Sequence, residues 1–470
     1  MFRLKQLSKD YLIYGIGSIL AKGVSFLLLP IYTRIFTPAD YGTIEMLNVI
    51  GNLVATILAM GTDAAQSMYF FKYKKKGFDT QARIVSAILQ LRILWGTFVV
   101  ILATFFGPLF NLYIFNGKLS WEYFAFTFTG VLLAQIMSQS AEVMRLLFRP
   151  LTFIGIIFVQ SALSVATILT AVVIFDQGIL GFISGTAIAS TLAALFGWYH
   201  ARKFISFKKI HFDWWPIIIK FGAPLVPVGF GMYLMNAADR WFIQYYWGDN
   251  ELGIFAAGAK LALLITLIVE TFRQAWWPIA LDAMHSDDGE ETFRKISNIY
   301  ISLACSGMIV LTYASPSLAE ILFDKRYHES WRIVGVIGWH SVFYGFFMIG
   351  AAGIWKSEKS FYNLPIMLFS TAAGLLANFI LVPSQGGIGA AAATVISNGV
   401  WITISYLLSQ RYWNIRLPIL FGTLSLIISW IYIWWFINFG FEQKITAFLL
   451  ALIICCMIVV TAARRIRFFK

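Results

Sequence analysis

ITAFLLALIICCMIVVTAA, residues 445–463, is a run of 19 residues that contains no charged side chain and is flanked by Lys444 and Arg464. An α-helix needs about 20 apolar residues to cross the hydrocarbon core of a bilayer. The stretch therefore predicts a transmembrane helix, and its basic flanks predict where that helix leaves the apolar layer.

Comparable segments recur along the whole chain. Charged residues make up 13% of the 470 residues, whereas a soluble domain carries about 25%. Hydropathy predicts about 14 spans, near 11–33, 41–63, 84–107, 122–144, 151–174, 178–199, 215–237, 252–274, 296–315, 331–354, 361–382, 387–408, 417–437 and 445–463. The predicted fold class is therefore an all-α integral membrane protein. Its function must be carried out inside the membrane, because the predicted loops are too short to hold another domain.

Basic residues are distributed unequally between alternate loops. If the N-terminus lies in the cytoplasm, most lysines and arginines of the loops also lie there, including Arg3, Lys5, Lys9, Lys72, Lys74, Lys75, Lys76, Arg149, Arg202, Lys203, Lys208, Lys209, Arg464, Arg465 and Arg467. This asymmetry is the positive-inside rule, and an even number of spans returns the C-terminus to the cytoplasm. The net charge of +13 thus follows from topology. It favours anionic membrane lipids and gives no reason to expect a nucleic-acid partner.

The sequence shows no pattern typical of a metal, nucleotide or covalent-catalysis site. The five histidines lack ligand spacing, and the three cysteines all fall within predicted spans. No Walker loop, dinucleotide fingerprint or nucleophile elbow is present. We therefore expect neither an enzyme nor a bound cofactor or metal. Any uphill transport would draw on an ion gradient or on the gradient of the substrate.

Two parts of the chain resemble each other. After the first predicted span come TRIF, residues 33–36, and DYGTI, residues 40–44. After the seventh come DRWF, residues 239–242, and ELGIF, residues 251–255. Because these spans are six apart and share an orientation, the pattern predicts a parallel internal repeat. The alternative is chance recurrence of Arg and Gly at helix ends.

The repeat leads to a predicted division of the chain into four parts. Residues 1–199 form an N-terminal lobe of spans one to six, and residues 200–214 form a basic cytoplasmic linker. Residues 215–408 form a C-terminal lobe of spans seven to twelve, and residues 409–470 add two spans and a basic tail.

Ionisable residues inside predicted spans are candidates for a functional site, because burying a charge in the bilayer costs several kcal/mol unless it faces protein or water. The cations are Lys22, Arg92, Lys220, Lys260 and Arg273. The polar or acidic candidates are Glu45, Asn48, Asn52, Glu142 and Glu270. Helical spacing puts Glu45, Asn48 and Asn52 on one face of span two. We expect spans one, two, seven and eight, with span four alongside, to line a water-filled, mainly cationic cavity suited to an anionic headgroup.

Structural roles compete with this interpretation. Glu142 and Arg145, like Glu270 and Arg273, have the i,i+3 spacing of pairs that neutralise each other. Lys220 can extend its ammonium group toward the membrane surface. The Gly and Pro residues of 222–227 are typical either of a hinge or of a static kink.

The stretch PIYTRIFTPADYG, residues 30–42, resembles the opening of bacterial Wzx-type polysaccharide and O-antigen flippases. These belong to the multidrug/oligosaccharidyl-lipid/polysaccharide exporter superfamily. DRWFI, residues 239–243, and LGIFAAGAK, residues 252–260, are similar to the counterpart in the second half of such proteins, and AWWP, residues 275–278, to a further segment.

The resemblance implies a 14-helix fold with two lobes that opens alternately to either side of the bacterial inner membrane. The implied substrate is undecaprenyl pyrophosphate carrying an oligosaccharide repeat unit, moved from the cytoplasmic to the periplasmic leaflet. The implied partners are this lipid-linked oligosaccharide, membrane lipids and a downstream polysaccharide polymerase. Proton or sodium coupling is implied by the same analogy, with Glu45 or Glu142 as the carboxylate.

Two other functions are weighed against this one. A cation-coupled multidrug antiporter of the same superfamily needs a mainly acidic cavity, which the excess of internal Lys and Arg disfavours. A membrane glycan polymerase or ligase generally needs a large outer loop, whereas the longest predicted outer loops, near 107–121, 238–251 and 316–330, are each about 15 residues long.

Overall fold

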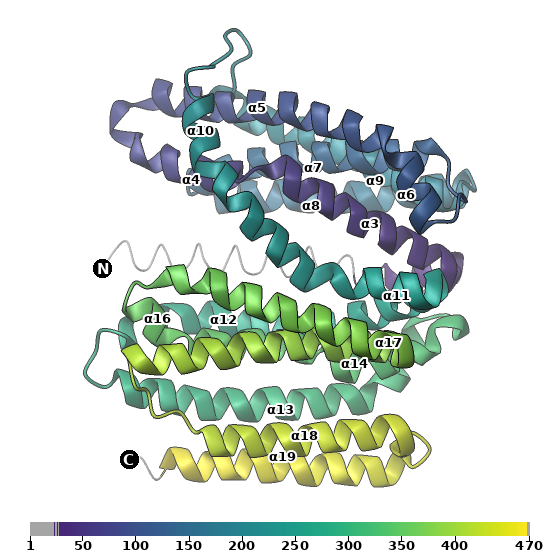
Figure 1. The fold of residues 1–470 in the computed structure, drawn as a ribbon, viewed down its shortest axis with the longest axis vertical. Helices are drawn as coiled ribbons and strands as arrows, with labels where there is room; N and C mark the ends of the chain where they lie inside the picture. The colour runs from purple at the N-terminus through teal and green to yellow at the C-terminus, as the bar shows by residue number, and fades with distance from the viewer. Residues whose placement is uncertain (1–22, 24–25, 27, 468–470) are drawn as a thin grey trace. The chain divides into compact units, whose positions relative to one another are not determined.

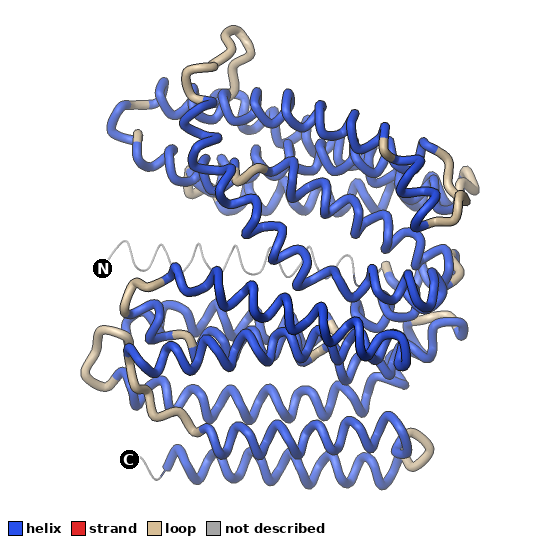
Figure 2. The backbone as a smooth tube through the Cα atoms, viewed as in Figure 1, coloured by secondary structure: helices blue, strands red, loops and turns tan. Residues whose placement is uncertain are grey.

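The computed structural model describes residue 23, residue 26 and residues 28–467, and its described part consists of helices and connecting turns without a β-strand (Figure 2). Eleven of its helical segments are long and apolar enough to cross a membrane. Two of these segments, Trp215–Ala283 and Asn363–Tyr412, each cover two predicted spans. Most of the first predicted span lies outside the described residues, so the count of 14 stays a prediction. The chain is an all-α multi-pass membrane protein.

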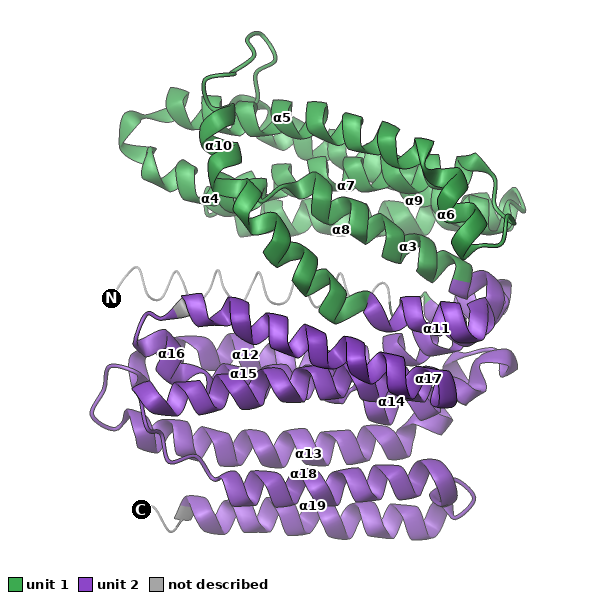
Figure 3. Ribbon diagram, viewed as in Figure 1, with its two compact units in different colours: residues 1–28, 43–237 green, residues 29–42, 238–470 purple. Residues whose placement is uncertain are grey.

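The chain forms two compact units (Figure 3). Unit 1 comprises residues 1–28 and 43–237, and unit 2 comprises residues 29–42 and 238–470. The division falls within a helix, α11, and the short segment 29–42 packs with the second unit. The four-part division of the chain that the repeat predicts stays a prediction.

Unit 1 contains the helices labelled α3 to α10 and the first part of α11 (Figure 1). Their bounds are Pro38–Ala59 (α3, whose first residues belong to unit 2), Thr62–Lys72 (α4), Phe78–Phe105 (α5), Gly107–Ile114 (α6), Trp121–Leu146 (α7), Pro150–Leu169 (α8), Gly178–Ala201 (α9), Trp215–Gly222 (α10) and Val226–Leu261 (α11). Small residues let α9 approach its neighbours closely. Gly185 lies against the backbone of Ile168 in α8, and Gly130 of α7 lies against Ala187.

Unit 2 contains α2, the second part of α11 and all later helices. Their bounds are Leu29–Ile35 (α2), Leu263–Ala283 (α12), Gly289–Leu322 (α13), Trp331–Ile337 (α14), Trp339–Gly350 (α15), Ala352–Lys356 (α16), Asn363–Tyr412 (α17), Ile419–Trp435 (α18) and Lys444–Arg467 (α19). A 3₁₀ segment, η5, covers Lys325–Ser330. The last two helices, α18 and α19, both pack against α13.

Glycines with positive φ break α11 and α17, the two longest helices among the described residues. Gly248 divides α11 with a φ of 78°, and Gly386 divides α17 with a φ of 54°. These are conformations that glycine adopts without steric cost. Hydrogen bonds join the two breaks, because the Gly387 N–H donates to Glu251 at 2.9 Å and the Trp247 indole donates to the Val382 carbonyl at 2.8 Å. Each break therefore separates two predicted spans.

The acidic-X-Gly motifs of the predicted repeat meet inside unit 2. A Cβ on Gly42 would overlap the Asp249 carbonyl oxygen, and a Cβ on Gly253 would overlap the Pro38 carbonyl oxygen. In each case the blocked carbonyl belongs to the residue four positions before the other glycine. This reciprocity is what two related motifs crossing about a local two-fold axis would produce, and it fits the repeat predicted from sequence.

Segment 30–42 is bound by η5 at Thr33 and Phe36. The Tyr327 hydroxyl donates to the Phe36 carbonyl at 3.0 Å, and the Arg326 guanidinium donates to the Thr33 carbonyl at 3.3 Å. The guanidinium also donates to Asp324, which holds the pKa of that carboxyl below its usual value. At the start of α3, the Asp40 N–H donates to the Thr37 hydroxyl and the Thr37 N–H donates to the Asp40 carboxylate, which is the capping-box arrangement.

Candidate functional site

Polar side chains lie along one side of α3 in unit 1. Glu45 is half-buried, whereas Asn48 and Asn52 are exposed, and Thr56 donates to the Asn52 carbonyl at 2.9 Å. A lipid-facing helix seldom carries exposed amides, because hydrocarbon cannot satisfy them. The stripe predicted from helical spacing therefore exists, and its exposed amides favour a surface in contact with water or a polar ligand.

Arg92 lies in α5 and is buried. Its guanidinium donates to the Asp63 carboxylate at 2.7 Å, the Thr62 hydroxyl at 2.6 Å and the Gln135 carbonyl at 2.7 Å. The Arg92 side chain is 0% exposed, while that of Asp63 is 51% exposed. These contacts neutralise the charge and tie α5 to α4 and α7. In this arrangement Arg92 braces three helices.

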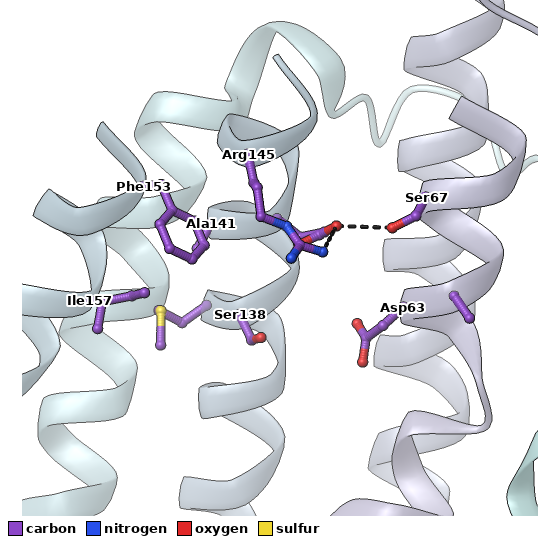
Figure 4. Close-up of a pocket in the computed structure, with 10 residues that line it drawn as sticks. Asp63, Ser67, Ser138, Ala141, Arg145, Phe153 and Ile157 are labelled. Carbon is purple, nitrogen blue, oxygen red and sulfur yellow. Dashed lines mark hydrogen bonds and ion pairs between the residues drawn. The ribbon is translucent and has the colours of Figure 1, made fainter. Parts of the chain in front are cut away.

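A pocket of about 410 Å³ lies beside this brace, between α4, α7 and α8 (Figure 4). Glu142 enters it from α7 and is 13% exposed. Its carboxylate accepts hydrogen bonds from Ser67 at 2.9 Å and from Arg145 at 2.7 Å. Asp63 faces the same space from α4, while Phe153 and Ile157 supply apolar lining from α8. The pocket is therefore polar on one wall and apolar on the other.

Lys220 belongs to α10, a short helix that is otherwise apolar. It is exposed, and no ion pair involves it among the residues that the structure describes. Just beyond it, Gly222 lies against the break between α3 and α4, where Gly61 has a φ of 65°. A Cβ on either glycine would overlap the backbone of the other break. Lys220 is thus held next to a tight contact between two interrupted helices.

The predicted site residues of unit 2 lie in two different settings. The Lys260 ammonium lies 5.9 Å from the ring centroid of Tyr41, within cation–π range. Arg273 and Glu270 form a two-pronged pair, with nitrogen–oxygen distances of 2.8 and 2.7 Å. The expected i,i+3 pairing of Glu270 with Arg273, like that of Glu142 with Arg145, is present.

Of the nine described candidates, six lie in unit 1 and three in unit 2. Arg92 and Arg273 are engaged by carboxylates, whereas Lys220 is exposed and forms no ion pair with a described residue. Lys22 lies outside the described residues. The cavity expected between spans one, two, seven and eight stays a prediction. Among the described residues, no group of three or more His, Cys, Asp or Glu side chains could hold a metal ion.

Sequence reasoning missed two carboxylates. Asp63 lies at the end of one predicted span and its partner Arg92 lies in the next, so no spacing within one helix connects them. Asp239 is 3% exposed in α11, where it pairs with Arg240 at 2.8 Å and accepts from the Thr394 hydroxyl at 3.1 Å. Each carboxylate could have been noticed as an ionisable residue within a predicted span or at its end. Its bonding partner could not have been identified from the sequence.

Comparison with known proteins places the chain in context. A family model described as "Polysaccharide biosynthesis protein" matches residues 7–284. The "Lsg locus putative protein 1" of Haemophilus influenzae is 23% identical over 284 residues, which are 59% of this chain and 66% of that protein. The "Capsular polysaccharide biosynthesis protein CapF" of Staphylococcus aureus is 24% identical over 184 residues, 38% of this chain and 46% of that one. The chain thus spans somewhat under two thirds of the first of these relatives and under half of the second.

Solved structures with the same fold are membrane transporters. One described as "Lipid II flippase MurJ, inward closed conformation" has a TM-score of 0.72 and 15% identity, covering 97% of this chain and 99% of that one. An inward-facing multidrug resistance MATE family transporter has a TM-score of 0.66 and 14% identity, covering 83% of this chain and 94% of that one. At these identities the likeness establishes the fold alone.

Proposed function

This chain belongs to the polysaccharide biosynthesis protein family, and we propose that it is a flippase for undecaprenyl-pyrophosphate-linked oligosaccharides. Its family and the fold that it shares with solved membrane transporters support this proposal. In this proposal the chain resides in the bacterial inner membrane with both termini in the cytoplasm. It moves the repeat unit to the periplasmic leaflet, where a polysaccharide polymerase would consume it.

The observation that carries the proposal is the polar surface of unit 1. Asn48 and Asn52 on α3 are exposed, and Lys220 is exposed on α10, a helix that is otherwise apolar. Amides can bind sugar hydroxyls, and an ammonium group can bind a phosphate. A headgroup that carries both sugar and pyrophosphate matches these groups, while its isoprenoid tail can remain in the bilayer.

Lys220 and Lys260 are the described cations that we assign to the pyrophosphate, together with Lys22. Lys220 supports this role because it is exposed and has no ion-pair partner among the described residues. The Lys260 ammonium lies 5.9 Å from the centroid of the Tyr41 ring, within cation–π range. Hydrogen bonds that involve a charged group each contribute about 1.5–3 kcal/mol, so each lysine matters measurably.

We also propose that a proton or sodium gradient drives the flipping, with Glu142 or Glu45 as the coupling carboxylate. Glu142 lines the pocket of unit 1 and is bound by Ser67 and Arg145. Glu45 is half-buried beside the exposed amides of α3. Both carboxylates lie in segments long enough to span the membrane.

The test is made in a strain that lacks the gene. Lipids are extracted and analysed by mass spectrometry for undecaprenyl-pyrophosphate-linked oligosaccharide, and surface polysaccharide is measured in parallel. We expect the lipid-linked oligosaccharide to accumulate on the cytoplasmic side, with loss of surface glycan and rescue by the wild-type gene.

The Lys220→Ala variant tests the site. We expect it to restore export at least about tenfold less well than wild type at equal protein level, because about 1.4 kcal/mol corresponds to a factor of ten. Lys118→Ala, at an exposed position of an outer loop, is the matched control. Rescue by Lys220→Ala at the wild-type rate would remove Lys220 from the site. Normal surface glycan with altered drug sensitivity in the deletion strain would favour the multidrug antiporter instead.

A further inference from the structure

Unit 1 contains a second pocket, of about 430 Å³, which the proposed function does not use. It lies where the turn between α7 and α8 meets the end of α9 and the start of α5 (these helices are labelled in Figure 1). Four basic residues line it, namely Arg149, His200, Arg202 and Lys203. By the distribution of basic residues along the sequence, these turns lie on the cytoplasmic side.

The charge of this pocket is of one sign. None of its lining residues is acidic, and Arg149, Arg202 and Lys203 are exposed without an ion pair among the described residues. The other pocket of unit 1 differs, because its single arginine is already bound to Glu142. Three cations without counter-charges at one concave site attract an anion, and a phosphate matches both arginine and lysine.

The basic side chains stand on a rigid frame. The Arg202 guanidinium lies 4.3 Å from the ring centroid of Tyr199, which holds its plane in place. Phe204 forms part of the lining, and its carbonyl accepts from the buried Ser86 hydroxyl of α5 at 3.0 Å. The ring of Phe204 lies 4.7 Å from that of Phe78, measured between centroids. The pocket is therefore preformed by contacts within unit 1.

Arg149 is placed by an unusual backbone. The preceding residue, Phe148, has a φ of 56°. This is a left-handed backbone conformation that residues other than Gly, Asn and Asp adopt only at some energetic cost. The Arg149 N–H donates to the Met144 carbonyl at 2.9 Å and so closes the end of α7. Arg149 is also the residue that precedes α8, so the positive end of that helix dipole adjoins the pocket.

We propose that this pocket binds the phosphate of an anionic membrane phospholipid at the cytoplasmic surface. Beside the cations, Met144, Leu147 and the rings of Phe78 and Phe204 give the pocket an apolar lining. A phospholipid presents its phosphate next to an apolar chain, whereas a soluble phosphate leaves that lining unused. Basic pockets between helices on this side of a membrane protein suit lipid headgroups. This inference does not depend on which cargo the transporter carries.

The experiment measures lipid binding to the purified full chain by native mass spectrometry. The probes are phosphatidylglycerol and phosphatidylcholine with identical acyl chains. The test variant combines R149Q, R202Q and K203Q, and the control combines K74Q, K75Q and K208Q, which remove equal charge from exposed positions outside the pocket. We expect wild type and control to retain phosphatidylglycerol about tenfold better than phosphatidylcholine, and the test variant to lose this preference.

Three results would overturn the proposal. An equal loss in the control variant would mean general attraction to a basic surface. Equal binding of both lipids by wild type would mean that the phosphate site has no preference for an anionic lipid. Displacement of phosphatidylglycerol by millimolar inorganic phosphate or pyrophosphate would identify a soluble anion as the ligand. A second variant, Tyr199→Leu, keeps every charge but removes the ring beneath Arg202, and it should weaken retention by about threefold.

Discussion

Arg92 and Asp63 form a pair whose two members differ in burial, and this difference predicts which of them is costlier to remove. The Arg92 side chain is 0% exposed and that of Asp63 is 51% exposed. Asp63→Asn leaves a buried guanidinium without a counter-charge, and we expect it to lower the free energy of unfolding by about 3–5 kcal/mol. Arg92→Met leaves a carboxylate that water can reach, and should cost about 1.5–3 kcal/mol.

Chemical unfolding of both variants in detergent micelles measures these costs. Arg332→Met is the control, because Arg332 and Glu329 form a pair with 46% and 64% exposed side chains, and such pairs contribute about 1 kcal/mol or less. A larger cost for Arg92→Met than for Asp63→Asn would show that the hydrogen bonds to Thr62 and Gln135 outweigh the charge pairing.

At the scale of helices, the crossing of α3 with the second part of α11 depends on Gly42 and Gly253. Adding a methyl group at either position places it within the backbone of the other helix. We expect Gly42→Ala and Gly253→Ala each to destabilise the protein by about 1–3 kcal/mol, the cost of overpacking. Since the contact is reciprocal, the two costs should be similar. Thermal unfolding in detergent provides the measurement.

Gly155→Ala in α8 separates this effect from the general effect of replacing glycine in a helix. No atom lies within 4 Å of the position that its Cβ would occupy. Alanine there should leave stability unchanged or raise it by about 0.5–1 kcal/mol, because glycine loses more backbone entropy on folding. Wild-type stability in Gly42→Ala would mean that the helices can separate without loss.

For the molecule as a whole, the proposed ion coupling predicts how flipping depends on gradients. Inverted membrane vesicles that contain the natural lipid-linked oligosaccharide can be given a proton or a sodium gradient separately. We expect one of the two gradients to accelerate flipping by the wild-type protein. The same gradient should have no effect on the variant that lacks the coupling carboxylate, which is either Glu142→Gln or Glu45→Gln. If the gradient accelerates flipping by both variants as much as by wild type, neither carboxylate couples flipping to the gradient.

Patterns local in sequence predicted much of this molecule. Apolar runs gave the helical class and most spans, and i,i+3 spacing predicted the pairs of Glu142 with Arg145 and of Glu270 with Arg273. The polar stripe on α3 followed from helical geometry. These features depend on residues within one helix, whose arrangement the α-helix itself fixes.

Contacts between helices could not be predicted in this way. Arg92 was expected to be a cavity cation, but its partner Asp63 lies 29 residues away on another helix. The pairing of segment 30–42 with residues beyond 238 also has no local signal. The similarity of the two motifs was visible in the sequence, whereas the contact between their glycines required the structure.

The membership of residues 29–42 in unit 2 has a consequence for how the protein is made. These residues leave the ribosome before their packing partners, which begin at residue 238, 196 residues after residue 42. At a synthesis rate of about 5–20 residues per second, the delay is roughly 10–40 s. For that time the insertion machinery or lipid must cover the segment, so biogenesis of this membrane protein includes an obligatory waiting period.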